Sequence, residues 1–159
     1  MVRWLPATCL SVLTVLALAG CGGSGFTVGG LTVDGPYTCA PGSANTAYSV
    51  HATAPLDNST SNKVQVKSVA AVMVVAAVHG KWQQAVGAKY DAGDVQFSPE
   101  SVGAGSKATL TATISSACTN AAHKGTNDNY ADYSVQLTIV TSAGTFHVTS
   151  QNKHRIIAP

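Results

Sequence analysis

The stretch Ala108-Thr109-Leu110-Thr111-Ala112-Thr113-Ile114-Ser115 decides the fold class. Apolar side chains occupy every second position, and small hydroxyl side chains occupy the positions between them. Because neighbouring residues of an extended chain point to opposite faces, this stretch predicts a β-strand with one buried and one solvated face. Cys118 continues the apolar parity, so we expect its side chain to be buried as well.

The same alternation returns near the C-terminus. Apolar residues alternate from Tyr133 to Ile139, Ser142 to Gly144 supply turn residues, and Phe146 and Val148 resume the pattern. Two alternating runs joined by a short turn predict a β-hairpin.

Residues 64–78 form the most apolar stretch outside the N-terminal region. Several of their valines are spaced by three, as on one face of a helix. The density of β-branched side chains and the alternating start Val64-Gln65-Val66-Lys67 favour a strand instead. The length of the stretch predicts either a bulged strand or two consecutive strands.

Composition supports an all-β chain and excludes one class of partner. Charged residues make up 10% of the 159 residues and the formal net charge is +2, so no clustered basic surface for nucleic acid is expected. About seven short strands without helical segments between them predict a two-sheet sandwich. The segment from Phe97-Ser98-Pro99 to Ala108-Thr109-Leu110-Thr111 resembles bacterial immunoglobulin-like domains, a fold that hosts binding, adhesion and spacer roles.

The N-terminus has the layout of a secretory signal: Arg3, an apolar run from Leu5 to Leu18, and the small residues Ala19-Gly20 before Cys21. Leu18-Ala19-Gly20-Cys21 resembles the lipobox of bacterial lipoproteins. That resemblance implies that Cys21 carries a diacylglyceryl group and becomes the first residue after cleavage by signal peptidase II. The alternative is an uncleaved N-terminal anchor with a fortuitous cysteine.

These features divide the chain into three parts. Residues 1–20 are the expected signal peptide, and 21–43 are the lipidated cysteine and a flexible glycine-rich tether with a short N-terminal strand. Residues 44–159 are the expected immunoglobulin-like β-sandwich. Of the four cysteines, Cys9 lies in the signal and Cys21 in the lipobox, so Cys39 and Cys118 predict one structural disulfide. Two unpaired buried thiols are the alternative.

No catalytic constellation or cofactor motif is evident. Ser106 lacks the second glycine of a nucleophile elbow, and no phosphate-binding loop is present. The five histidines show no metal-ligand spacing, and strand parity places His51 and His147 on solvated faces. Aspartates at strand ends are weak candidates for calcium ligands, with turn formation as the alternative role: Asp91, Asp94, Asp128 and Asp132.

Three short features suggest contacts less directly. Asn58-Ser59-Thr60 matches a glycosylation sequon by chance, and Lys153-His154-Arg155 is a small basic cluster that we expect to be solvated. Four aromatic residues would mark a protein or glycan partner if they were exposed together, although core packing is the default: Trp82, Tyr90, Tyr130 and Tyr133.

The sequence therefore predicts a lipoprotein on the outer face of a bacterial membrane, or on the outer membrane of a Gram-negative host. We expect a non-catalytic binding module whose partners are the membrane, through the lipid on Cys21, and an envelope protein or glycan. A structural or shielding lipoprotein, such as a phage-encoded surface-exclusion protein, is the alternative. An enzyme is the third and least supported hypothesis.

Overall fold

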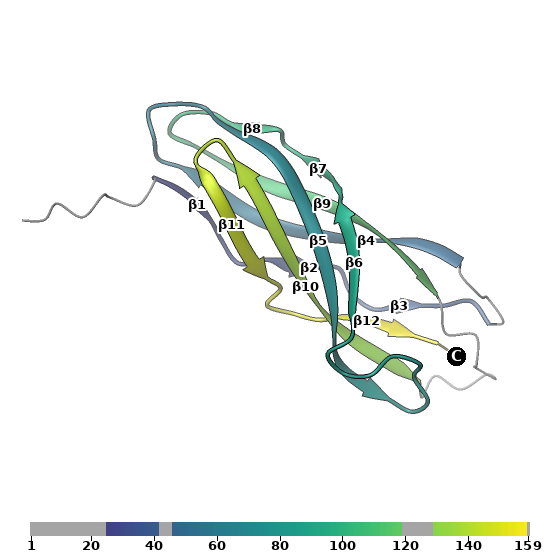
Figure 1. The fold of residues 1–159 in the computed structure, drawn as a ribbon. Coiled ribbons are helices and arrows are strands. Elements are labelled where there is room, and N and C mark those ends of the chain that lie inside the picture. Colours follow the sequence, from purple (N-terminus) through teal and green to yellow (C-terminus); the bar gives the residue numbers. More distant parts are fainter. Residues whose placement is uncertain (1–24, 42–45, 119–128, 159) are drawn as a thin grey trace, which may run out of the picture.

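The computed structural model describes residues 25–41, 46–118 and 129–158. Within these ranges the chain forms strands and no helix (Figure 1), so they offer no helix long and apolar enough to cross a membrane. The strands are β1 (Phe26–Val28), β2 (Thr32–Val33), β3 (Tyr37–Thr38), β4 (Thr46–Asn58), β5 (Val64–His79), β6 (Lys89–Asp94), β7 (Gln96–Ser98), β8 (Ser101–Val102), β9 (Ser106–Cys118), β10 (Tyr130–Thr141), β11 (Gly144–Thr149) and β12 (His154–Ile157).

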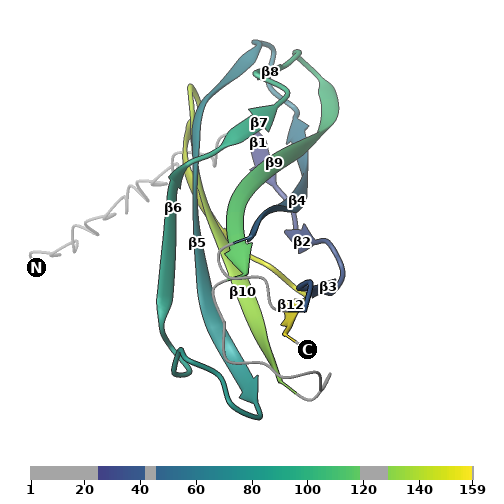
Figure 2. The ribbon, with the colours of Figure 1, turned by 90° about the vertical axis from the view of Figure 1, so that its right-hand side faces the viewer.

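The strands form two sheets that pack face to face (Figure 2). The first has the order β1-β4-β9-β7, with β2 also paired to β4; the second has the order β3-β12-β10-β5-β6, with β11 on β10 and β8 on β5. Consecutive long strands thus alternate between the sheets, since β4 and β9 lie in one and β5 and β10 in the other. This is the connectivity of an immunoglobulin-like sandwich, and the predicted fold class is confirmed.

The core is built from the alternating strands. Leu110, Ala112 and Ile114 of β9 are 0–1% exposed, and the predicted apolar face of β10 is buried with them in one cluster. The expected hairpin is present, because β10 and β11 pair antiparallel up to Thr141 and Gly144. Gly144 has a φ of 141°, a backbone conformation that favours glycine.

The valine-rich stretch is one strand of 16 residues, β5. Its pairing with β10 shifts register twice, between Asp132 and Tyr133 and again between Val140 and Thr141. Of the two expected arrangements, the structure therefore has the bulged strand. The bulge between Val66 and Ser68 shifts the alternation by one residue, so that Val66 and Val69, three residues apart, both reach the core.

The glycine-rich segment before the sandwich is shorter than the sequence predicts. β1 pairs with the end of β4, and Phe26 and Leu31 are 1% and 0% exposed, so the expected tether boundary at residue 43 is wrong. Gly29 serves close packing here, since a Cβ atom on it would lie 2.5 Å from the Pro55 ring. The short strand expected at this point is β2, and the chain then crosses to the second sheet as β3.

The predicted disulfide joins the two sheets. Cys39 follows β3 of the second sheet, Cys118 ends β9 of the first, and their Cα atoms are 5.9 Å apart. Both residues are buried. The bond fixes the first strands of the chain to a strand 79 residues later.

Replacing both cysteines, as Cys39→Ser with Cys118→Ser, should lower the free energy of unfolding by about 4 kcal/mol, because the unfolded chain loses its closed loop. Urea unfolding followed by tryptophan fluorescence measures the change. Reduced wild-type protein is the matched control and should unfold with the double variant. A loss below about 1 kcal/mol would show that the bond contributes little.

Candidate functional site

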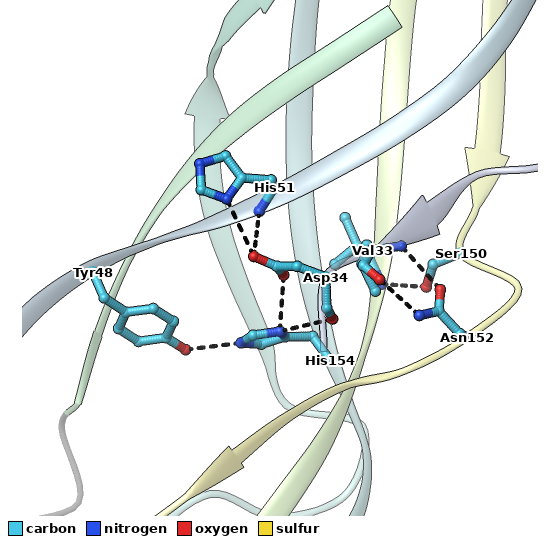
Figure 3. A network of polar contacts seen from close by, with 8 residues as sticks. Val33, Asp34, Tyr48, His51, Ser150, Asn152 and His154 are labelled. Carbon is cyan, nitrogen blue, oxygen red and sulfur yellow. Dashed lines mark hydrogen bonds and ion pairs between the residues drawn. The ribbon is translucent and has the colours of Figure 1, made fainter. Parts of the chain in front are cut away.

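A buried polar network joins the two sheets, and Figure 3 shows its members. His154, at the start of β12, is 1% exposed. Its Nδ1 atom lies 3.1 Å from Oδ1 of Asp34, and its Nε2 atom lies 3.3 Å from the Tyr48 hydroxyl. The other carboxylate oxygen of Asp34 accepts a hydrogen bond of 3.0 Å from the His51 amide and lies 3.2 Å from the His51 ring. We call Asp34, Tyr48, His51 and His154 the sheet clamp.

The environment of the sheet clamp is tightly packed. Asp34 Oδ1 is shielded from solvent and makes no well-aligned hydrogen bond, which leaves the His154 ring as its nearest polar contact among the described residues. The Tyr48 ring stacks on Tyr37 with centroids 3.9 Å apart. Burial raises the pKa of the Tyr48 phenol well above its usual value, so this hydroxyl stays protonated.

Asp34, His154 and Tyr48 form a carboxylate–imidazole–hydroxyl series, the order found in catalytic triads. The chemistry does not follow, however. A phenol with a raised pKa is a poor nucleophile, and a buried imidazole has no access to substrate. The geometry is that of a structural contact that links β4, β12 and the segment after β2. The adjacent pair of hydrogen bonds between Val33 and the Asn152 side chain has the same role.

A second feature lies at the β5–β6 end of the sandwich. The large hydrophobic side chains exposed in the described residues are Val78, Val86 and Tyr90, at 39%, 59% and 42%. All three belong to the hairpin of β5 and β6 or its turn. Large apolar side chains that are exposed on one hairpin mark it as a candidate interaction site. We call this part of the molecule the hairpin end.

Gly25 lies at the opposite end of the sandwich. Its carbonyl accepts hydrogen bonds of 2.6 Å from the amide and the hydroxyl of Ser59, in the turn between β4 and β5. The hairpin end extends from Tyr90, which pairs with Met73, to the end of β5 at His79. At about 3.3 Å per residue it lies roughly 30–50 Å from the beginning of β5.

A small cavity opens between the sheets at the hairpin end. It has a volume of about 70 Å³ and is lined by Met73, Gln84, Tyr90, Ser116, Ala117, Tyr133 and Ile156. The Tyr133 hydroxyl donates a 2.6 Å hydrogen bond to the Gln84 side chain and accepts one of 3.3 Å from the Trp82 indole. Burial raises the pKa of Tyr133. We call this cavity the inner hollow.

The four aromatic residues singled out in the sequence do not form one exposed patch. Tyr133 belongs to the core at 5% exposure, Trp82 is partly buried and Tyr90 is exposed. Tyr130 stacks on His79, and the Arg155 guanidinium lies 3.9 Å above its ring. Of the four, Tyr90 alone contributes substantially to the exposed apolar surface.

Two of the aspartates expected as weak calcium candidates have other partners in the structure. Asp132 makes two hydrogen bonds to Arg155, at 2.7 and 2.9 Å. Asp91 accepts one of 2.9 Å from the Gly93 amide, and Asp94 ends β6 on the surface. Asp128 lies outside the described residues, as does Cys21. Over residues 25–41, 46–118 and 129–158, no three His, Cys, Asp or Glu side chains are grouped to hold a metal.

Sequence reasoning missed two buried polar residues. His51 and His147 are exposed as expected, but His154 is buried, in contrast to the solvated basic cluster predicted there. The sequence does offer a signal for the burial of His154: it lies two residues before the apolar Ile156, so in a strand both side chains point to the same face. Asn58 of the sequon is fully buried, and its side chain donates to the carbonyls of Asn62, Val102 and Gly103. A glycan on Asn58 is incompatible with that position.

Replacing His154 with Gln should lower the free energy of unfolding by roughly 2–3 kcal/mol, because Asp34 and Tyr48 each lose the buried imidazole nitrogen that they contact. His147→Gln on the exposed face of β11 is the matched control and should change it by less than about 0.5 kcal/mol. Urea titrations of both variants make the comparison. Equal midpoints would show that the sheet clamp does not stabilise the sandwich.

Comparisons with known proteins find only distant similarity. No family model matches the chain, and no curated protein is similar to it in sequence. Among solved structures, a PapD-like domain of human CEP192 is 12% identical with a TM-score of 0.42, covering 97% of this chain and 98% of that one. AggA, the major subunit of aggregative adherence fimbriae type I from Escherichia coli, is 12% identical with a TM-score of 0.40, covering 84% and 95%.

The CooA pilin subunit of enterotoxigenic Escherichia coli is a further structural neighbour. It is 15% identical with a TM-score of 0.31, covering 81% of this chain and 97% of the pilin subunit. Likeness at this level is too distant to transfer a ligand or an activity to this chain.

Proposed function

We propose that the chain is a bacterial envelope lipoprotein, anchored by a lipid on Cys21, whose sandwich acts as a non-catalytic binding module. The anchor rests on the lipobox resemblance of Leu18 to Cys21. Two or three acyl chains on one residue hold a protein on a membrane essentially permanently. The partner is a protein or glycan of the envelope.

One observation supports the binding role most. The exposed large apolar side chains of the described residues gather at the hairpin end, away from Gly25. Gly25 is only four residues after Cys21, so these two residues are at most about 14 Å apart. A lipid on Cys21 would therefore leave the hairpin end directed away from the membrane, where a partner can reach it.

Cys21→Ala should prevent lipid attachment and give either an unprocessed precursor or released protein. Cys9→Ala, within the expected signal, is the matched control and should leave lipidation unchanged. Labelling of growing cells with a radioactive fatty acid, followed by membrane fractionation, distinguishes the two variants. A Cys21→Ala protein that remained processed and membrane-bound would refute the lipid anchor.

A photo-crosslinking residue at Val86 should join the protein to one envelope component in intact cells, because Val86 is the most exposed apolar side chain of the hairpin end. The same residue at Thr109, on the exposed face of β9, is the control and should give no such product. Equal products at both positions, or none at Val86, would favour the spacer or shielding role instead.

A further inference from the structure

In the part of the chain that the structure describes, strand β9 is unpaired on its β7 side at both ends, and we call its C-terminal end, Ser115 to Cys118, the open edge. β7 pairs with β9 only from Gln96 opposite Thr113 to Ser98 opposite Thr111. Directly before Gln96 the chain belongs to β6 in the other sheet. On its other side β9 is paired with β4 along its whole length. Among the described residues, Ser115 to Cys118 therefore have a strand neighbour on one side only.

The neighbouring edge strand, β6, is protected against pairing with another chain. Its register is interrupted by a bulge, Gly93 has a φ of 62°, and Lys89, Asp91 and Asp94 place charges along it. Bulges and charges are the devices that natural proteins use to block edge strands. The open edge of β9 has neither, since its sequence is Ser-Ser-Ala-Cys and its pairing with β4 is regular.

Hollows lie on both faces of the sheet beside this edge. The inner hollow reaches Ser116 and Ala117 from the core side. On the outer face, a notch of about 220 Å³ is lined by Ser49, Ala92, Asp94, Val95, Gln96, Thr113 and Ser115. Side chains of a strand placed at this edge would enter the two hollows alternately, because a strand has a period of two.

The two hollows differ in chemistry, and the difference defines what fits them. The inner hollow is lined by uncharged side chains and has room for one aliphatic side chain. Asp94 is the one charged residue that lines either hollow, and it lies in the outer notch. A strand that alternates aliphatic with basic residues is complementary to both.

We infer that the partner docks by adding an extended strand to the open edge of β9, with an aliphatic side chain in the inner hollow and a basic one beside Asp94. This inference rests on the proposed binding role and names the kind of partner. In such strand addition, main-chain hydrogen bonds supply affinity and the pockets for alternate side chains supply specificity.

The test uses the full mature protein in detergent and a labelled peptide, Thr-Val-Lys-Val-Lys-Val-Thr, at up to millimolar concentration. Fluorescence anisotropy should show saturable binding. Two control peptides should bind at least about tenfold more weakly. One has the same composition without alternation, and the other carries N-methyl groups on alternate residues and so cannot donate along one edge.

Two variants locate the binding site. Ser115→Lys places a charge at the open edge and should weaken binding about tenfold, whereas Thr109→Lys, on the same face of the same strand, should change it less than about twofold. Asp94→Lys should weaken binding of the lysine peptide about tenfold and strengthen binding of its glutamate counterpart. The melting temperature of each variant checks that it is folded.

Absence of binding, equal binding of the N-methylated peptide, or no effect of both Ser115→Lys and Asp94→Lys would overturn strand addition. These results are independent of the Val86 crosslinks. Crosslinks without peptide binding would leave the binding role intact and place the partner on the hairpin end without an added strand. Peptide binding without crosslinks would instead count against the envelope partner.

Discussion

The parity of β9 is the constraint on which the rest of the structure depends. Its even-numbered residues, from Leu110 to Cys118, point into the core, and its odd-numbered ones face solvent. A slip of one residue would exchange the two sets and bury a row of threonines. The same parity brings Cys118 to Cys39, and it places Ser115 and Ser116 on opposite faces of the sheet beside the open edge.

The disulfide and the sheet clamp lie in the same half of the sandwich. Cys118 pairs with Thr46 and Ser116 with Tyr48, at the beginning of β4 and far from Asn58. The disulfide and the sheet clamp therefore hold the strands that line the inner hollow. A site that is rigid before its ligand arrives loses less conformational entropy on binding. In the proposed docking, the position of these links would therefore serve recognition as well as stability.

Local patterns were sufficient to predict the strands but not all of their partners. The alternation of β9, β10 and β11 depends on neighbours two residues apart, and the sequence displays it directly. The role of Phe26 and Leu31 depends on contacts with distant strands, and the glycines around them resemble a flexible linker. The sequence places Gly29 in a flexible tether, whereas in the structure its missing side chain allows close contact with Pro55. Asp34 and His154 are 120 residues apart, and no local pattern relates them. The open edge of β9 is likewise not predictable from local sequence, because it arises where the chain changes sheet before Gln96.

The proposed arrangement, with a lipid at one end of the molecule and exposed apolar side chains at the other, can be examined in place by hydrogen exchange. The comparison is between the lipidated protein on its native membrane and the same protein purified in detergent. Our account predicts that the membrane sample gains amide protection in residues 78–90 and 115–118 and nowhere else in the described chain. Protection gained only around Gly25 and the turn between β4 and β5, or no gain at all, would contradict it.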